Sequence, residues 1–183
     1  TLLQWPTTPR ALAVSINLSA RNLVDDRCMQ YLRGLIARHA LPPGTIELEI
    51  TETTLMHDPE GARELLAAIA AEGVSLSIDD YGTGYSSLAY LRRLPIRALK
   101  IDRAFVRDMR TDEHDAIIVH STINLAHNLG LQVVAEGVED LPTLALLREM
   151  GCDQAQGCCI AQAMPADDVR AWLVNFRPPI IEG

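Results

Sequence analysis

The sequence has few aromatic residues, no long apolar run and no basic stripe, and each shortage excludes a class of protein. Phe, Trp and Tyr make up only 4% of the 183 residues, so the core must be built mainly from aliphatic side chains. No run approaches the roughly 18 apolar residues of a membrane span, and residues 1–5 lack the regions of a signal peptide. We therefore expect a cytoplasmic chain without membrane insertion, in a parent protein that is free or tethered to the inner membrane.

The charge balance argues against a nucleic-acid polymer as partner. With 16 basic and 24 acidic residues the formal net charge is −8, and the longest basic cluster is Arg92-Arg93 followed by Arg97 and Lys100. A binder of nucleic-acid backbones normally carries a basic stripe. A phosphate ligand would therefore need divalent cations to mediate its binding.

The four cysteines indicate free thiols rather than a disulfide framework. They have no Cys-x-x-Cys spacing and no secretory context. A chain of this length buries roughly 70% of the surface that its unfolded form exposes, so its core needs neither disulfides nor a structural metal.

Short β-branched runs alternate with helical segments along the whole chain, which predicts parallel strands joined by right-handed crossovers. The predicted strands are residues 13–18, 46–51, 74–78, 97–101, 131–135 and 153–155. Helix ends are also readable: Asp58 and Pro59 begin a helix that ends before Gly73, Gly130 follows a helix from about Glu113, and Gly151 follows the helix after Asp140.

Polar residues at the strand ends favour a barrel over an open doubly wound sheet. All loops of a (β/α)8 barrel face one mouth, whereas an open sheet gathers its ligand groups mainly at one switch point. Here all six predicted strands contribute polar residues, namely Asn17; Glu49 and Glu52; Asp79 and Asp80; Lys100 and Asp102; Glu136 and Glu139; and Gln156.

Asp79-Asp80 is the strongest single feature. Two adjacent carboxylates at the end of a strand must be neutralised by protonation or by divalent metal. Oxygen donors from Glu49, Asp79, Asp80, Glu136 and Asn17 suit Mg²⁺ or Mn²⁺ rather than zinc. Such a site can hold two ions, which together support phosphodiester hydrolysis.

Each residue also has a plainer interpretation. Asp79-Asp80 is typical of a turn or cap, Glu47, Glu49 and Glu52 of a solvated strand face, and Lys100 of an ion-paired or snorkelling lysine. One shared site explains five successive strand ends better than five coincidences do. Gly82-Thr83-Gly84 is a weak phosphate-loop signal and fits a lid better, and the five histidines are interpreted as surface or packing residues.

The ordered motifs resemble the EAL-domain family of cyclic di-GMP phosphodiesterases over nearly the whole chain. The matching segments are Asn17-Leu18-Ser19, residues 47–52 (ELEITE), residues 79–88 (DDYGTGYSSL), residues 99–102 (LKID), residues 135–139 (AEGVE) and residues 151–157 (GCDQAQG). The DDYGTGYSSL block is the most specific of them.

The resemblance implies a TIM-like (β/α)8 barrel with one antiparallel strand, which hydrolyses cyclic di-GMP to linear pGpG with two Mg²⁺ or Mn²⁺ ions. By motif position, the metal ligands would be Asn17, Glu49, Asp79, Asp80 and Glu136. Lys100 would position the attacking water, with Glu139, Gln156 and Asp80 as the other catalytic residues. Glu52 and Asp102 would support the site, and Glu52 would steady a lid that includes Tyr81, Gly82, Thr83, Gly84, Tyr85 and Ser86.

The chain also departs from the family pattern. It contains no Glu-Ala-Leu tripeptide, whose glutamate is a family metal ligand upstream of the Asn-Leu-Ser strand. We therefore expect residues 1–183 to be a single EAL-like domain that is N-terminally incomplete, with about six strands and weak or no activity. Residues 157–165 also lack the aromatic-rich pattern that the family predicts there.

Two kinds of function stay open at this point: a metal-dependent phosphodiesterase, and a degenerate cyclic di-GMP sensor or protein-interaction module without catalysis. A different TIM-barrel lyase or hydrolase is a broader alternative. A homodimer and an upstream sensory or GGDEF domain are the other partners that the sequence leaves open.

Overall fold

The structure is a computed structural model that describes residues 12–178 apart from residues 24, 57 and 83–87. The chain divides into two compact units, one of residues 13–100 and the other of residues 1–12 and 101–183. We call these the first unit and the second unit.

The first unit alternates strands and helices, as its sequence pattern predicts. Its elements are β1 (Val14–Asn17), α1 (Ala20–Leu23), α2 (Asp26–His39), β2 (Ile46–Thr51), α3 (Glu52–Met56), α4 (Pro59–Ala71), β3 (Ser75–Tyr81), α5 (Leu88–Leu91) and most of β4 (Ala98–Ile101). The strands are hydrogen-bonded in the order β1-β2-β3-β4, and the β1–β2 and β2–β3 pairs are parallel. Within this unit the order follows the chain, without the reversal that makes a switch point in a doubly wound sheet.

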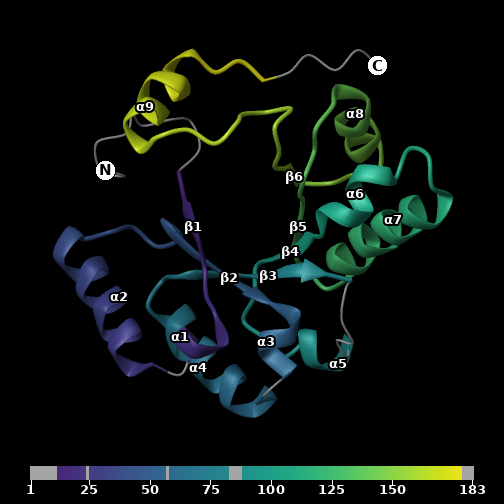
Figure 1. The fold of residues 1–183 in the computed structure, drawn as a ribbon. Coiled ribbons are helices and arrows are strands. Elements are labelled where there is room, and N and C mark those ends of the chain that lie inside the picture. Colours follow the sequence, from purple (N-terminus) through teal and green to yellow (C-terminus); the bar gives the residue numbers. More distant parts are fainter. Residues whose placement is uncertain (1–11, 24, 57, 83–87, 179–183) are drawn as a thin grey trace. The chain divides into compact units, whose positions relative to one another are not determined.

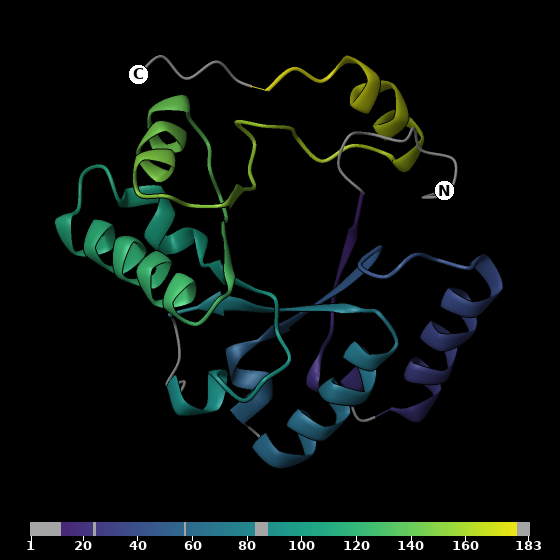
Figure 2. The same ribbon diagram turned by 180° about the vertical axis from the view of Figure 1, so that it is seen from behind.

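The core of the first unit lies between the strands and their helices. Figures 1 and 2 show α2 and α4 on the same side of β1–β3. The fully buried side chains of Ile50, Leu76 and Ile78 on the strands and of Leu66 on α4 belong to this core. Burying one such side chain contributes about 1.5–3 kcal/mol. Most residues of β2, β3 and β4 are buried, and they include the polar side chains of Glu49, Ser77, Asp79 and Lys100.

β1 differs from the other strands of this unit. Ser15, Ile16 and Asn17 are exposed, and Ile16 has 43% of its surface open to solvent. Its register pairs Val14 with Ile46 and Asn17 with Glu49 on β2. Within the described residues β2 is its only hydrogen-bonded neighbour.

The second unit contains α6 (Arg103–Asp108), α7 (Glu113–Asn128), β5 (Gln132–Ala135), α8 (Leu141–Glu149), β6 (Gln154–Ala155) and α9 (Ala166–Asn175). β5 and β6 are parallel, with Val134 opposite Gln154. Ile101, the last residue of β4, belongs to this unit, and its carbonyl accepts a hydrogen bond from the Glu136 N–H at 3.2 Å. In Figures 1 and 2, α7 and α8 lie on the same side of β5 and β6.

The predicted helix ends are confirmed. The Asp58 side chain accepts from the Gly61 N–H at 3.2 Å at the start of α4, and Asp140 accepts from the Thr143 N–H at 2.7 Å at the start of α8. These bonds satisfy donors that a helix leaves unpaired in its first turn. The bond from Thr143 also holds the pKa of Asp140 below its usual value.

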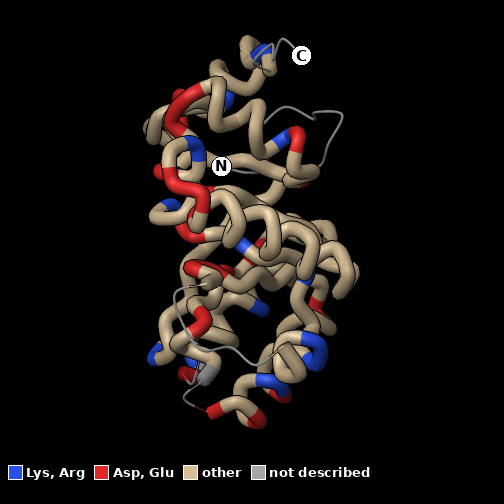
Figure 3. The backbone as a smooth tube through the Cα atoms, turned by 90° about the vertical axis from the view of Figure 1, so that its right-hand side faces the viewer, with Lys and Arg blue, Asp and Glu red and all other residues tan. Residues whose placement is uncertain are grey.

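The sequence predicts neither a membrane span nor a basic stripe. No helix in the described part of the chain is long and apolar enough to cross a membrane. In Figure 3 the Lys and Arg residues form short separate segments along the backbone, interspersed with Asp and Glu.

Candidate functional site

A buried cation between two carboxylates lies in the first unit. Lys100 Nζ is 2.6 Å from Glu49 Oε1 and 3.5 Å from Asp79 Oδ1. Only 3% of the Lys100 side chain is exposed, against 8% of Glu49 and 13% of Asp79. Burying charges is costly unless they are paired, so this cluster depends on its ion pairs.

The parallel register explains why these residues meet. Side chains two residues apart on a strand share a face, so Glu47 and Glu49 point the same way on β2. The register sets Glu49 opposite Ser77 on β3, two residues before Asp79. Ser77 Oγ donates to Glu47 Oε1 at 2.7 Å, so the two strands are joined by polar contacts along this face.

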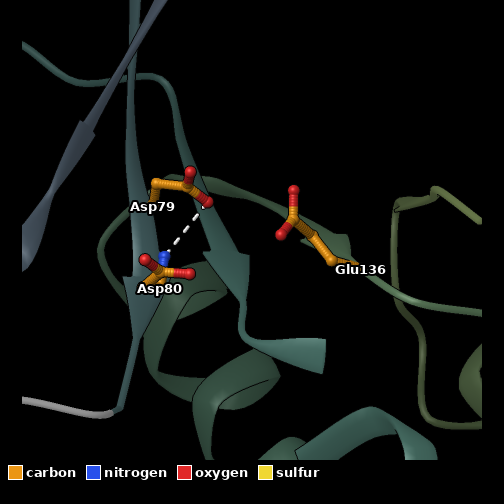
Figure 4. Close-up of side chains that lie close together, drawn as sticks. All are labelled: Asp79, Asp80 and Glu136. Atoms are coloured by element: carbon orange, nitrogen blue, oxygen red, sulfur yellow. Dashed lines mark hydrogen bonds between the residues drawn. The ribbon is translucent and has the colours of Figure 1, made fainter. Parts of the chain in front are cut away.

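The backbone at Asp80 has an unusual conformation that re-aims its side chain. Its φ is +53°, in the left-handed region that few residues other than glycine adopt, although Asp tolerates it better than most. The N–H of Asp80 donates to Asp79 Oδ1 at 3.0 Å, the dashed contact of Figure 4. Because this residue interrupts the regular strand alternation, Asp79 and Asp80 need not point to opposite faces.

This region corrects the predicted strand end. The predicted strand ends at Ile78, but β3 continues through Asp79 and Asp80 to Tyr81. Aspartate is depleted in strands, which is why its presence favoured a turn. The conformation of Asp80 accommodates both carboxylates within β3.

Glu52 and Tyr81 are two further predicted site residues of the first unit that are at least partly buried. Glu52 begins α3 directly after β2 and is only 2% exposed. Burial raises the pKa of Tyr81, and the negative charge of Glu52 raises it further. The remaining residues of the predicted lid, Thr83, Gly84, Tyr85 and Ser86, lie outside the described residues, as does His57.

The solvated-face interpretation is wrong for Glu49 on β2 and for Glu52 at the start of α3, because both are buried. The ion-paired interpretation of Lys100 is confirmed by its two carboxylate contacts. Asn17, in contrast, is exposed at the end of β1. Its neighbour Leu18 donates its N–H to the Glu49 carbonyl at 2.8 Å, which fixes the backbone of Asn17 beside β2.

Backbone hydrogen bonds position the predicted site residues of the second unit. The Gln156 N–H donates to the Ala135 carbonyl at 2.8 Å, and the Val138 N–H donates to the Gln156 carbonyl at 3.0 Å. The segment after β5, with half-buried Glu136 and exposed Glu139, is thereby tied to exposed Gln156. Asp102 caps α6 through the Ala104 N–H at 2.6 Å.

Gly157 allows these two segments to approach closely. A Cβ atom at this position would lie 2.1 Å from the Val138 carbonyl oxygen and 2.4 Å from the Val138 nitrogen. Only glycine leaves room for such an approach of two backbones. Sequence reasoning missed this role, although a glycine directly after Gln156 was a signal that could have shown it.

The donor set suits hard divalent cations. The carboxylates of Asp79, Asp80 and Glu136, drawn as sticks in Figure 4, offer oxygen atoms, which Mg²⁺ and Mn²⁺ prefer. Glu49 adds a further buried carboxylate on β2. The residues present therefore fit the divalent cations that the sequence predicts.

Comparison with known proteins points to one family. The model of the EAL domain family matches residues 1–163. The chain is 41% identical over 158 residues to the bifunctional diguanylate cyclase/cyclic di-GMP phosphodiesterase MucR of Pseudomonas aeruginosa, covering 86% of this chain and 23% of that protein. It is 42% identical over 173 residues to the cyclic di-GMP phosphodiesterase NbdA of the same species, covering 92% of this chain and 22% of that protein. The chain thus spans about a fifth of the length of these curated relatives.

Solved structures give the same result for the fold. The MucR phosphodiesterase in complex with c-di-GMP matches with a TM-score of 0.83 and 40% identity, over 87% of this chain and 64% of that chain. The EAL domain of Mycobacterium smegmatis DcpA matches with a TM-score of 0.85 and 38% identity, over 92% and 76% respectively. These likenesses confirm the α/β fold of the EAL type that the sequence predicts. Given the family-model match over residues 1–163, this chain belongs to the EAL domain family.

Proposed function

We propose that this chain forms part of a phosphodiesterase that hydrolyses cyclic di-GMP to linear pGpG in the cytoplasm. The observation that carries the proposal is the buried Glu49–Lys100–Asp79 cluster, with Asp80 next to it in a left-handed conformation. Backbone strain and buried charge are costly, and they are typical of functional sites. The relatives named as cyclic di-GMP phosphodiesterases supply the substrate class.

In this proposal the metal ligands are Asn17, Glu49, Asp79, Asp80 and Glu136, assigned from the motifs in which they stand. Bound Mg²⁺ or Mn²⁺ would supply Lewis acidity at the phosphoryl oxygens and a lower pKa for the attacking water. Charge neutralisation favours that binding, because four of the five proposed ligands are carboxylates.

The remaining residues bind and orient. Lys100 would hold the attacking water through its ammonium group, which Glu49 and Asp79 keep in place. Glu139 and Gln156 would orient the water and substrate from the second unit. Glu52 would steady the lid through the segment that begins at Tyr81, and Asp102 would hold the start of α6.

The direct test is conversion of cyclic di-GMP to pGpG, followed by chromatography with Mg²⁺ or Mn²⁺ present. The 183-residue chain and a version extended at its N-terminus by a segment with the Glu-Ala-Leu motif should be assayed in parallel. The unextended chain is expected to be the weaker enzyme, because it contains no Glu-Ala-Leu tripeptide. Glu49→Gln should reduce turnover by at least a hundredfold, because it removes a proposed ligand and a partner of Lys100.

The matched control is Glu47→Gln. Glu47 lies on the same strand and face as Glu49, but it bonds Ser77 and has no assigned catalytic role. Turnover should be retained in this variant. Equal loss in both variants would contradict the assignment of Glu49. Binding of cyclic di-GMP without formation of pGpG in the extended version would favour the sensor module over the enzyme.

A further inference from the structure

Two adjacent cysteines follow Gln156 in the second unit. Cys158 is exposed, Cys159 is half-buried, and both are free thiols. They lie in a turn that is closed by hydrogen bonds to the Gly157 carbonyl from the Ile160 N–H at 3.0 Å and the Ala161 N–H at 3.2 Å. The turn places two sulfur ligands on one short segment.

The backbone of this turn is fixed from a second side. The Cys159 N–H donates to the Val138 carbonyl at 3.0 Å, and Gly157 packs against the backbone of the same residue. A ligand that binds both thiols therefore finds them on an ordered turn. Less conformational freedom remains to be lost on binding, which favours chelation.

The adjacency of the two residues disfavours an ordinary disulfide. Neighbouring Cα atoms lie about 3.8 Å apart across a trans peptide, below the roughly 4.4–6.8 Å that most disulfides span. A larger bridging atom between the sulfurs relieves this constraint by lengthening the bridge. Soft thiolate ligands select soft, thiophilic centres.

We propose that Cys158 and Cys159 form a chelating site for trivalent arsenic. With phenylarsine oxide as the probe, two S–H bonds and the As–O bond break, two As–S bonds form, and one water molecule leaves. Arsenic remains trivalent throughout, so the step needs neither oxidant nor reductant.

The other two cysteines provide internal controls. Burial raises the pKa of Cys152, and its Sγ donates to the Gln154 carbonyl at 3.2 Å and the Val133 carbonyl at 3.7 Å. Cys152 is therefore a protonated, engaged thiol with low reactivity. Cys28 lies on α2 in the first unit and has no cysteine beside it in the sequence.

The test is retention of phenylarsine oxide by the 183-residue chain, measured by mass spectrometry of the intact protein. After washing with excess 2-mercaptoethanol, the wild-type chain should keep one phenylarsenic group, and 2,3-dimercaptopropanol should remove it. Cys158→Ser and Cys159→Ser should each lose this retention, whereas Cys28→Ser and Cys152→Ser should keep it. Circular dichroism checks that each variant is folded.

Fragment-ion spectra of the wild-type adduct provide a second measurement that does not depend on any variant. They should place the arsenic across residues 158–159. Adducts that require Cys152, or retention that is unchanged in Cys158→Ser, would overturn the proposal. This test measures binding of phenylarsine oxide and does not require phosphodiesterase activity. The arsenic site can therefore be confirmed or overturned even if the proposed phosphodiesterase activity is absent.

Discussion

The two units hold their candidate site residues by different physical means. In the first unit, Glu49, Asp79 and Lys100 are side chains buried from solvent and fixed by ion pairs. In the second unit, Glu139 and Gln156 are exposed, and backbone hydrogen bonds and the close approach at Gly157 fix the segments that carry them. Ion pairs therefore fix the candidate site residues of the first unit, and backbone contacts fix those of the second. Different substitutions should destabilise the two units.

The largest expected effect is the loss of the buried cation in Lys100→Met. Glu49 and Asp79 would then lie buried without this cation beside them. Breaking a buried ion pair from one side typically costs about 3–5 kcal/mol, so the free energy of unfolding should fall by about that amount. Urea denaturation at pH 7 measures it.

Arg63→Met is the control for a cation in an ordinary setting. Arg63 lies 3.2 Å from Glu60 on α4, with 37% and 70% of the two side chains exposed. Exposed pairs contribute little, so this variant should lose less than about 1 kcal/mol. Similar losses of unfolding free energy in both variants would show that burial does not distinguish the two ion-pair sites. Adding Glu49→Gln to Lys100→Met should recover part of the loss, because it removes one uncompensated charge.

A steric change should affect the second unit instead. Gly157→Ala would place its Cβ 2.1 Å from the Val138 carbonyl oxygen, so one backbone must move. Overpacking of this kind costs about 1–3 kcal/mol. Thermal unfolding should show the loss, and hydrogen exchange should show faster exchange at the Val138 and Cys159 amides.

Gly34→Ala is the matched substitution in the first unit. Gly34 lies within α2, and a Cβ there meets nothing within 4 Å. Alanine is the better helix former by about 0.5–1 kcal/mol, so this variant should be more stable than the wild type. A stabilising effect at both glycines would refute the steric role of Gly157.

The smallest expected effect concerns pH and the amino ends of β5 and β6. Asp153 accepts from the Val133 N–H at 2.8 Å and lies 2.9 Å from His127 Nε2. Burial raises the pKa of Asp153, but the bonds from His127 and Val133 outweigh burial and lower it below the ordinary 3.8. The stabilisation is therefore present above pH 3.8 and lost as the pH falls through the lowered value.

Asp153→Asn tests this dependence in urea titrations at pH 7, 4 and 3. The variant should be less stable than the wild type at pH 7, and the gap should narrow as the pH falls. A gap of constant size across this range would contradict a charge-based contribution. The variant leaves the Glu49–Lys100 ion pair of the first unit unchanged, so any change in pH dependence comes from the second unit.

Much of the fold was readable because its signals are local. Alternation of apolar strands and capped helices predicts all six described strands to within a few residues, and Asp58 and Asp140 mark their helices correctly. The grouping of Glu49 with Lys100 was also predictable, since both stand near the carboxyl ends of strands that a parallel fold aligns.

The remainder depends on tertiary geometry that no local signal encodes. Burial of Glu52 follows from packing rather than from its neighbours in sequence, which left a solvated face equally plausible. Aspartate has a poor strand propensity, yet Asp80 lies within β3 with a positive φ, and no local signal predicts that combination. The contact of His127 with Asp153 joins residues 26 positions apart, so it emerges only from the packing of α7 against β5.

The conformation of Asp80 has a consequence for how mutational scans of this strand are interpreted. Asparagine shares the tolerance of aspartate for a positive φ, whereas alanine must bear a penalty of about 1–2 kcal/mol. An alanine scan therefore mixes a backbone effect with the loss of a carboxylate at this position and overstates the importance of the charge. Asp80→Asn removes the charge but keeps the tolerance for a positive φ. The difference in unfolding free energy between the asparagine and alanine variants therefore measures the backbone contribution at this position.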